Sequence, residues 1–287
     1  MSSFLQQYQR QPKLFIDLPS KGLWYNDTII EGEQYVQIPV FGMNAMDEIM
    51  FKTPDALFTG EATAEVIRSC IPTILDPWQL VGYDIDYILI AIRIATYGDS
   101  IDTECMCPYC QESSSNGLSL TQMLSGFNNY ETSFSFTLNE LTFNLKPITY
   151  KVTSEFSVEN YHNERELFQI QMLKDISDSE KNKKMQNSYN KSSTINVKIA
   201  ISHIESITKD EDIETSIESI TEFVVNNDAE FFKILRDKIK ELTQRWNLPQ
   251  FEIICPAPDC GKKFKTSLEL DYSNFFGASS LRSRNLI

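Results

Sequence analysis

The chain carries two short cysteine turns, Cys107-Pro108-Tyr109-Cys110 and Cys255-Pro256-Ala257-Pro258-Asp259-Cys260-Gly261. Each places two thiols on a tight turn that contains Pro or Gly, as one knuckle of a zinc ribbon does. Two or four intervening residues let the chain reverse while both sulfur atoms point at one ion. The N–H groups of such a turn can also donate to the thiolates. We therefore expect one tetrahedral Zn²⁺, bound by Cys107, Cys110, Cys255 and Cys260.

The metal would join two distant parts of the chain, because residues 111–254 separate the cysteine pairs. Each pair is followed by a segment that can form a strand, at 118–120 and 263–268. Loop-closure entropy grows slowly with loop length, whereas structural zinc contributes on the order of 10–16 kcal/mol in small peptides. Four thiolates leave no open position for a catalytic water, so we expect a structural ion.

Two alternatives stay open for this site. Cys105 lies two residues before Cys107 and would face the same side of a strand, so it could replace Cys107 as a ligand. We prefer Cys107 because only Cys107 and Cys110 make the two-residue knuckle. Residues 107–110 also match the active-site sequence of glutaredoxins, so thiol redox catalysis is a second interpretation of this turn. Residues 111–117 are predicted to be a polar turn and are a poor helix, however, and no βαβ pattern precedes the first knuckle, so thiol redox catalysis is the weaker interpretation.

The composition limits the classes of function. The chain has 287 residues, of which 41% are hydrophobic and 11% aromatic, enough for a packed core. Its net charge of −14, from 40 acidic and 26 basic residues, argues against a broad nucleic-acid-binding face. A zinc-ribbon factor acting on nucleic acid is therefore an alternative that the charge opposes.

Cysteine use and hydropathy favour a cytosolic product without a membrane span. Four of the six cysteines lie in metal-type pairs, which fits a reducing compartment better than a disulfide scaffold. The first residues lack the basic start and apolar run of a signal peptide, and the longest apolar stretch, 85–95, is too short to cross a bilayer.

The predicted fold class is α+β, mainly helical, with a small β element near the N-terminus, a β-hairpin and the split zinc ribbon. The hairpin is predicted from the alternation in 133–138 and 141–145 around Asn139-Glu140. Helix 84–97 is apolar nearly all round, which predicts burial at the centre of the N-terminal half. The other expected helices begin at Asn44, which can cap the first, and cover 61–70, 154–173, 178–207, 213–225 and 229–246, the last capped by Asp228. Cys70, His162 and His203 are expected to pack or to lie on the surface.

The chain is expected to divide into five parts. These are an N-terminal arm at 1–12, an N-terminal α+β half at 13–106, the split zinc ribbon at 107–127 and 247–277, a hairpin plus helical insertion at 128–246, and a C-terminal tail at 278–287. Both ends carry apolar residues without an apolar period, so we expect them to order against a partner. Arg282 and Arg284 suit an acidic neighbour or a second copy.

Several motifs follow one another in a specific order. They are Leu18-Pro19-Ser20-Lys21-Gly22 with Trp24-Tyr25, Asp84 through Arg93 to Thr96-Tyr97-Gly98 before the first knuckle, 143–150, His203-Ile204-Glu205-Ser206-Ile207, and Phe275-Phe276-Gly277 after the second knuckle. Together they resemble the baseplate hub and hub-assembly protein family of T-even-type contractile-tailed bacteriophages, over about residues 14–277. The second knuckle, with four residues between its cysteines, and Cys105 depart from the family's pattern.

The resemblance implies a structural or assembly role in the phage tail without catalysis. Its partners would be other tail or baseplate proteins, with further copies of itself as an alternative, and neither nucleic acid nor membrane. The protein would reside in the host cytoplasm during assembly and in the virion baseplate if it is retained. The residues agree with the absence of catalysis, because we find no Ser/His/Asp constellation or phosphate-binding glycine loop and only two histidines.

Overall fold

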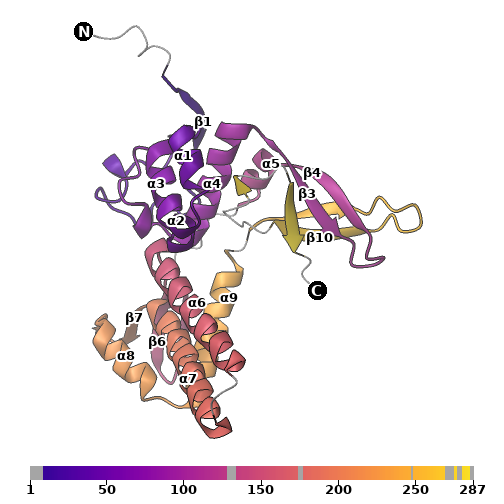
Figure 1. The fold of residues 1–287 in the computed structure, drawn as a ribbon. Helices are drawn as coiled ribbons and strands as arrows, with labels where there is room; N and C mark the ends of the chain where they lie inside the picture. Colours follow the sequence, from indigo (N-terminus) through magenta and orange to yellow (C-terminus); the bar gives the residue numbers. More distant parts are fainter. Residues whose placement is uncertain are drawn as a thin grey trace. The chain divides into compact units, whose positions relative to one another are not determined.

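A computed structural model shows two compact units (Figure 1), one formed by Met1–Tyr130 with Asn247–Ile287 and the other by Glu131–Trp246. The structure describes residues 9–127, 134–173, 177–246, 248–268, 275–276 and 280–284, with the backbone alone at 268 and 280–284. The expected α+β class is confirmed, since helices are combined with small, mostly antiparallel sheets. In the described part, no helix is long and apolar enough to cross a membrane.

The first unit contains helices, short 3-10 turns and two sheets. In chain order its elements are β1 (Pro12–Ile16), η2 (Glu31–Glu33), β2 (Ile38–Phe41), α1 (Ala45–Met50), α2 (Pro54–Thr59), α3 (Glu61–Cys70), η3 (Pro77–Gln79), α4 (Gly82–Tyr97), β3 (Ser100–Met106), β4 (Ser113–Ser119), α5 (Leu120–Ser125), β9 (Gln250–Ile254), β10 (Lys263–Leu268) and β11 (Ser280–Arg284). The antiparallel pair of β1 and β2 is the small β element expected near the N-terminus.

Helix α4 is the centre of this unit, as its apolar sequence predicts. Its fully buried side chains include Ile85, Ile88, Leu89, Ile90 and Ile92. The helix ends at Gly98, whose φ of 93° lies in the left-handed region that favours glycine.

A buried carboxylate in the first turn of α4 holds the 18–22 turn. Asp84 accepts hydrogen bonds from the Ser20 N–H (3.1 Å) and the Tyr25 hydroxyl (2.6 Å), and that hydroxyl accepts from the Val81 N–H (3.1 Å). Gly22 has a φ of 77°, and a Cβ there would overlap the Tyr35 ring. Residues 18–22 therefore form a structural turn, as expected of a site without a phosphate-binding glycine pattern.

The same helix binds the segment after the second knuckle. Arg93 is buried and donates from Nη1 to the carbonyl of Phe275. Its guanidinium also lies 5.2 Å from the Phe275 ring centroid and 5.4 Å from that of Tyr97. Phe276 stacks on Phe51 at 4.4 Å between centroids. Two motifs far apart in the sequence thus meet on one helix.

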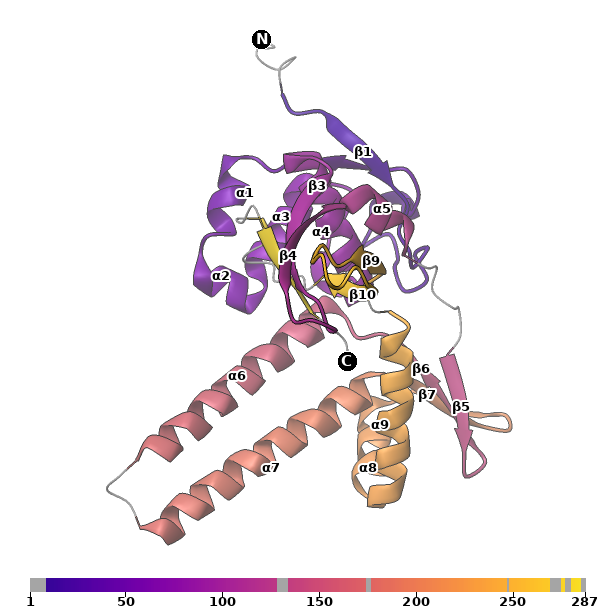
Figure 2. The same ribbon diagram turned by 90° about the vertical axis from the view of Figure 1, so that its right-hand side faces the viewer.

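The ribbon is a five-stranded sheet in the order β4-β3-β11-β10-β9. Figures 1 and 2 show its magenta strands, β3 and β4, beside its yellow strands, β9 and β10. Strand β4 begins at Ser113, inside the run 111–117 that the sequence predicts to be a polar turn. That prediction is wrong because β3 supplies a backbone edge, with which β4 pairs from Ser100↔Ser119 to Met106↔Ser113.

The C-terminal tail also differs from the expectation. Five of its residues form β11, which runs parallel to β3 and antiparallel to β10 instead of waiting unpaired for a partner. The facing edges of β3 and β10 would otherwise leave N–H and C=O groups unpaired, and a strand between them satisfies both. Residues 277–279 and 285–287 lie outside the described part.

The arm is anchored to its own unit at its described end. Arg10 donates to the carbonyls of Gly42 (3.0 Å) and Ser69 (2.5 Å) and lies 3.5 Å from the Asp47 carboxylate. Residues 9–12 therefore do not need a neighbouring protein to be placed. Residues 1–8 of the expected arm lie outside the described part.

The second unit places helices on a four-stranded antiparallel sheet of order β5-β6-β7-β8. Its elements are β5 (Phe134–Leu138), β6 (Leu141–Leu145), α6 (Tyr150–Met172), α7 (Asp178–Ser202), β7 (Ile204–Lys209), β8 (Asp212–Glu214), α8 (Ile217–Val225) and α9 (Ala229–Gln244). The predicted hairpin is confirmed by β5 and β6, whose turn residues Asn139 and Glu140 both have positive φ.

The predicted helix caps are confirmed in both units. Asn44 in the first unit and Asp228 in the second accept hydrogen bonds from N–H groups in the first turns of α1 and α9.

Strands β7 and β8 replace parts of two expected helices, 178–207 and 213–225. Helix α7 ends at Ser202, and the chain then pairs with β6 at Phe143↔Ile207 and Leu145↔Ile204. The helical prediction fails here because isoleucines continue across the boundary, while the edge of β6 and the β-branched side chains favour a strand.

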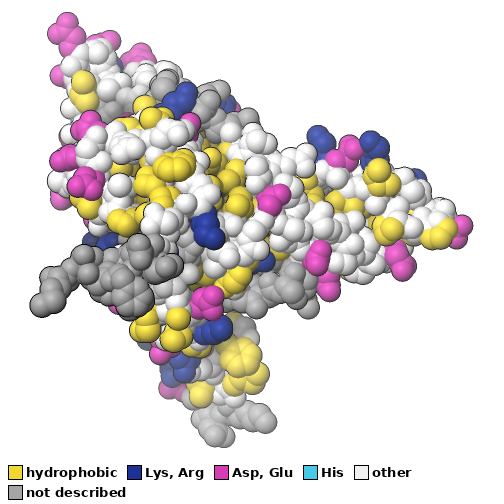
Figure 3. All heavy atoms as spheres, turned by 90° about the horizontal axis from the view of Figure 1, so that it is seen from above, with side chains coloured by type: hydrophobic (Ala, Val, Ile, Leu, Met, Phe, Trp, Pro, Cys, Tyr) yellow, Lys and Arg dark blue, Asp and Glu magenta, His cyan; other side chains and the backbone are white. Residues whose placement is uncertain are grey.

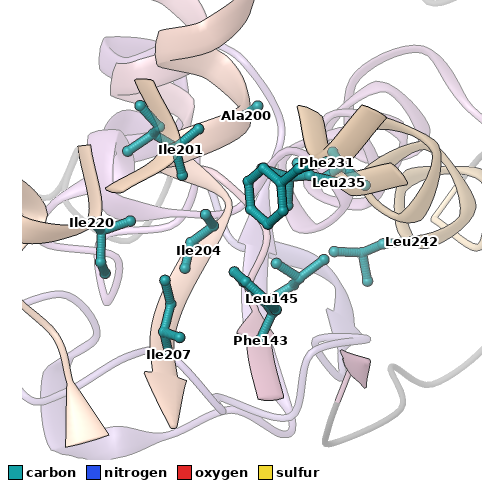
Figure 4. Close-up of a cluster of buried hydrophobic side chains, with 12 residues drawn as sticks. Phe143, Leu145, Ala200, Ile201, Ile204, Ile207, Ile220, Phe231, Leu235 and Leu242 are labelled. Atoms are coloured by element: carbon teal, nitrogen blue, oxygen red, sulfur yellow. The ribbon is translucent and has the colours of Figure 1, made fainter. Parts of the chain in front are cut away.

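The core of the second unit lies between this sheet and helices α7, α8 and α9 (Figure 4). Phe143 of β6 is fully buried, and its ring lies 5.0 Å from that of Phe136 and 5.7 Å from that of Phe231. The other buried members are Leu145, Ala200, Ile201, Ile204, Ile207, Ile220, Val224, Leu235, Ile239 and Leu242. This unit therefore has a hydrophobic core of its own.

The buried carboxylate on α4 predicts a pH dependence. Burial raises the pKa of Asp84 from 3.8 to about 6, against the opposing effect of its Ser20 and Tyr25 donors. Protonated Asp84 then stabilises the fold fully below about pH 4, and this contribution is lost as the pH rises through 6. We expect the free energy of unfolding of the wild type, minus that of Asp84→Asn, to fall by about 2 kcal/mol between pH 4 and pH 7. Urea titrations of both proteins would measure it, and parallel pH curves would contradict the assignment.

Candidate metal centre

The structure brings the two cysteine pairs together. The sulfur atoms of Cys107, Cys110, Cys255 and Cys260 all lie within 4.8 Å of one another. The Cys107–Cys260 pair is 3.8 Å apart and the Cys110–Cys255 pair 3.6 Å apart. A tetrahedral Zn²⁺ with Zn–S bonds of about 2.3 Å needs sulfur atoms about 3.8 Å apart. The four thiols could therefore hold such an ion with small adjustments.

The two knuckles have the same local structure despite their different spacing. The N–H of Cys107 donates to the carbonyl of Glu112, and that of Cys255 to the carbonyl of Lys262, both at 2.9 Å. These bonds close both turns at the ends of their hairpins, so the extra residues of the second knuckle are accommodated inside its turn.

The residue after each second cysteine takes a left-handed conformation. Gln111 has a φ of 62° and Gly261 a φ of 57°. Glycine adopts this conformation without strain, whereas glutamine does so at some cost. In both knuckles, the left-handed residue that lets the chain turn back into the second hairpin strand therefore directly follows the second cysteine.

Backbone N–H groups point at the thiols. Burial raises the pKa of Cys107, but the N–H groups of Cys110 and Tyr109 outweigh it and lower that pKa to about 7. The Ala257 N–H lowers the pKa of Cys255, but burial and the neighbouring thiols raise it to about 12. Four thiolates this close repel one another, so a cation would be required to keep all of them deprotonated.

Cys105 is placed differently from these four residues. It is fully buried on the inward face of β3, in an apolar cluster that contains Ile253 and Phe264 as well as Cys107 and Cys255. Within the described ranges, the group of clustered thiols comprises Cys107, Cys110, Cys255 and Cys260. This arrangement supports the choice of Cys107 over Cys105 as a ligand.

The surroundings of the site disagree with the two alternative functions. The residues after Cys110 lead into β4, not into the helix that a glutaredoxin-type thiol requires. On the face seen in Figure 3, the right-hand projection, which corresponds to the ribbon strands, carries both acidic and basic side chains. Lys263, for example, pairs with Glu252 at 2.8 Å, and Lys262 lies 4.7 Å from the Tyr109 ring centroid.

The remaining singled-out residues lie elsewhere. Cys70 is fully buried in α3, and His203 is buried with its Nδ1 2.9 Å from the Lys146 carbonyl oxygen. Burial lowers the pKa of His203. His162 is exposed on α6. The structure thus confirms that these residues pack or lie on the surface.

The thiol cluster predicts unequal effects of single cysteine substitutions. Cys255→Ser should abolish stoichiometric zinc and lower the free energy of unfolding by several kcal/mol, because ligand loss and loop opening act together. Cys105→Ser should retain the zinc and cost less, since Cys105 lies outside the group of four clustered thiols. Elemental analysis and urea unfolding with and without a chelator would measure both effects. Zinc-free wild-type protein, or equal zinc loss in Cys105→Ser and Cys107→Ser, would contradict the ligand set.

One comparison with known proteins identifies the family. The family model described as T4 bacteriophage base plate protein matches residues 43–277, a range that includes α4, all four clustered cysteines and the whole second unit. No curated protein and no solved structure matches the chain. Because the family model covers most of the chain, the protein belongs to the T4 bacteriophage base plate protein family.

Proposed function

We propose that this protein is a structural or assembly component of the baseplate hub, acting through contacts with other tail proteins and without catalysis. The family match over residues 43–277 carries the proposal. Members of a baseplate act by assembling with other tail proteins, so contact surfaces would perform the function. The host cytoplasm is the place of assembly, and the virion baseplate the final place if the protein is retained.

We further propose that each chain holds one structural Zn²⁺ through Cys107, Cys110, Cys255 and Cys260. The spacing of the four sulfur atoms and the N–H groups aimed at them support a closed thiolate site. Such a site leaves no position for a substrate or a catalytic water. Its role would be to fasten the two arms of the ribbon, between which the second unit is inserted.

Genetic complementation tests the assembly role. Phage lacking this chain should accumulate incomplete tails, and the full-length chain supplied in trans should restore them. Mass spectrometry of purified tails, with the chain quantified against known baseplate proteins, would show whether it is retained. Normal tails in the absence of the chain would refute the proposal.

The C-terminal strand separates a contact role from a folding role. Deletion of residues 279–287 should block tail assembly, because it removes β11 from between β3 and β10 and also removes any contact made by the tail. The double variant Arg282→Gln/Arg284→Gln keeps the backbone pairing of β11 and serves as the matched control. A block in both variants supports docking onto an acidic partner, whereas a block in the deletion alone assigns the tail to the fold. Normal tails with the deletion would exclude both roles.

A further inference from the structure

Helices α6 and α7 form a long hairpin in the second unit (Figure 2). Polar contacts join the two helices at its middle. Asn163 of α6 donates from Nδ2 to the Ser188 carbonyl (3.0 Å) and to the Ser192 hydroxyl (2.6 Å), and it accepts from the Ser188 hydroxyl (2.6 Å). These groups occupy positions where a stable helix pair usually buries apolar side chains.

Few fully buried apolar residues join these two helices away from the sheet. They are Ile170 of α6 and Ile195 of α7, since Ala200 and Ile201 belong to the core on the sheet, and Phe156 and Leu167 on the α7 side of α6 are partly buried. The ion pairs Lys191–Glu166 and Lys198–Glu159 are about half exposed and contribute little. Helices of 23 and 25 residues thus share an interface with few fully buried apolar side chains and a polar centre, which leaves room for a further partner on their other faces.

The side of α6 turned away from α7 carries an exposed apolar stripe. Tyr161, Phe168 and Met172 are 48%, 57% and 61% exposed. At 100° per residue these three lie on one face, opposite Asn163 and Ile170, which are buried on the α7 side. Together with Val158 and Arg165 they recur at alternating spacings of three and four residues, the pattern of a coiled-coil seam. We call residues 158, 161, 165, 168 and 172 the outer seam.

The charge in the middle of the outer seam specifies its occupant. Arg165 is exposed and has no ion-pair partner in the described part of the chain. Burial of its guanidinium between Tyr161 and Phe168 would require a carboxylate from the other helix. Pairing two identical outer seams, parallel or centred antiparallel, would bring two Arg165 groups together, so a second copy is disfavoured.

We propose that the outer seam of α6 binds an amphipathic helix of another tail protein, one with heptad-spaced apolar residues and an Asp or Glu placed opposite Arg165. This inference rests on the proposed assembly function and names the kind of surface that performs it. Heptad spacing selects a helix as the ligand, and Arg165 selects an acidic one.

Site-specific cross-linking tests the seam in the full-length chain. A photoreactive amino acid replaces Phe168 in one protein and Tyr189 of α7, which is 49% exposed but outside the outer seam, in the control. Both are produced in infected cells, irradiated during tail assembly and analysed by mass spectrometry. The Phe168 position should cross-link to a helical, acidic segment of a different tail protein, and the Tyr189 position should not. Cross-links to the same chain, to a second copy or to nothing would overturn the proposal.

Charge reversal at Arg165 and at its partner is the second test of the seam. Arg165→Glu should reduce the cross-link about tenfold or more, Arg165→Lys should retain most of it, and changing the cross-linked acidic residue to Lys should rescue Arg165→Glu. Unchanged helix content by circular dichroism shows that the variants fold. Normal tails with Arg165→Glu and with Phe168→Ala/Met172→Ala would sink the seam but leave the assembly role standing. Normal tails without the chain would remove the assembly role itself.

Discussion

The ribbon can close only if the chain, after residues 111–254, brings the second cysteine pair back to the first. Four sulfur atoms lie within 4.8 Å although residues 111–254 separate the two cysteine pairs. The inserted segment allows this only if it forms a hydrophobic core from its own residues, without residues of the ribbon. The second unit meets that condition, because Phe143 and Leu235 are fully buried within its own sheet and helices. Entropy alone would not prevent the return, since closing a long loop costs little more than closing a short one.

The proposed zinc ion and the Phe275–Phe276 pair would both fasten the returning chain, with different contributions to the free energy. A structural zinc contributes on the order of 10–16 kcal/mol, whereas burying Phe275 and Phe276 contributes about 1.5–3 kcal/mol for each ring. Arg93 adds a charged hydrogen bond to the Phe275 carbonyl, but its buried Nε has no hydrogen-bond partner in the described part, which reduces the gain. The ion would therefore contribute most of the free energy that holds the two parts of the ribbon together. The phenylalanine pair would determine where the C-terminal segment lies on α4.

Local signals in the sequence predicted the elements that depend on local physics. The knuckles are recognisable from their spacing, α4 from its apolar run and the β5–β6 hairpin from alternation around two turn residues. Strands β4 and β11 were missed because Ser113–Ser119 and Ser280–Arg284 have weak patterns of their own and pair with edges supplied by β3 and β10. The change from α7 to β7 was missed for the same reason. The cysteine cluster could be proposed from the sequence, but the placement of Cys105 in packing required the register of β3.

The motifs that carry the family resemblance turn out to be scaffold. Ser20 and Tyr25 bind the buried carboxylate of Asp84, and Phe275 binds Arg93, so these side chains are occupied inside the first unit. A protein that acts by contact has to present other residues to its neighbours. The outer seam of α6 has the required properties, because Tyr161, Phe168 and Met172 are exposed and lie on the face of α6 opposite Asn163, which binds α7. Because the second unit has a core of its own that leaves these side chains exposed, the outer seam stays available to the complementary helix that we propose.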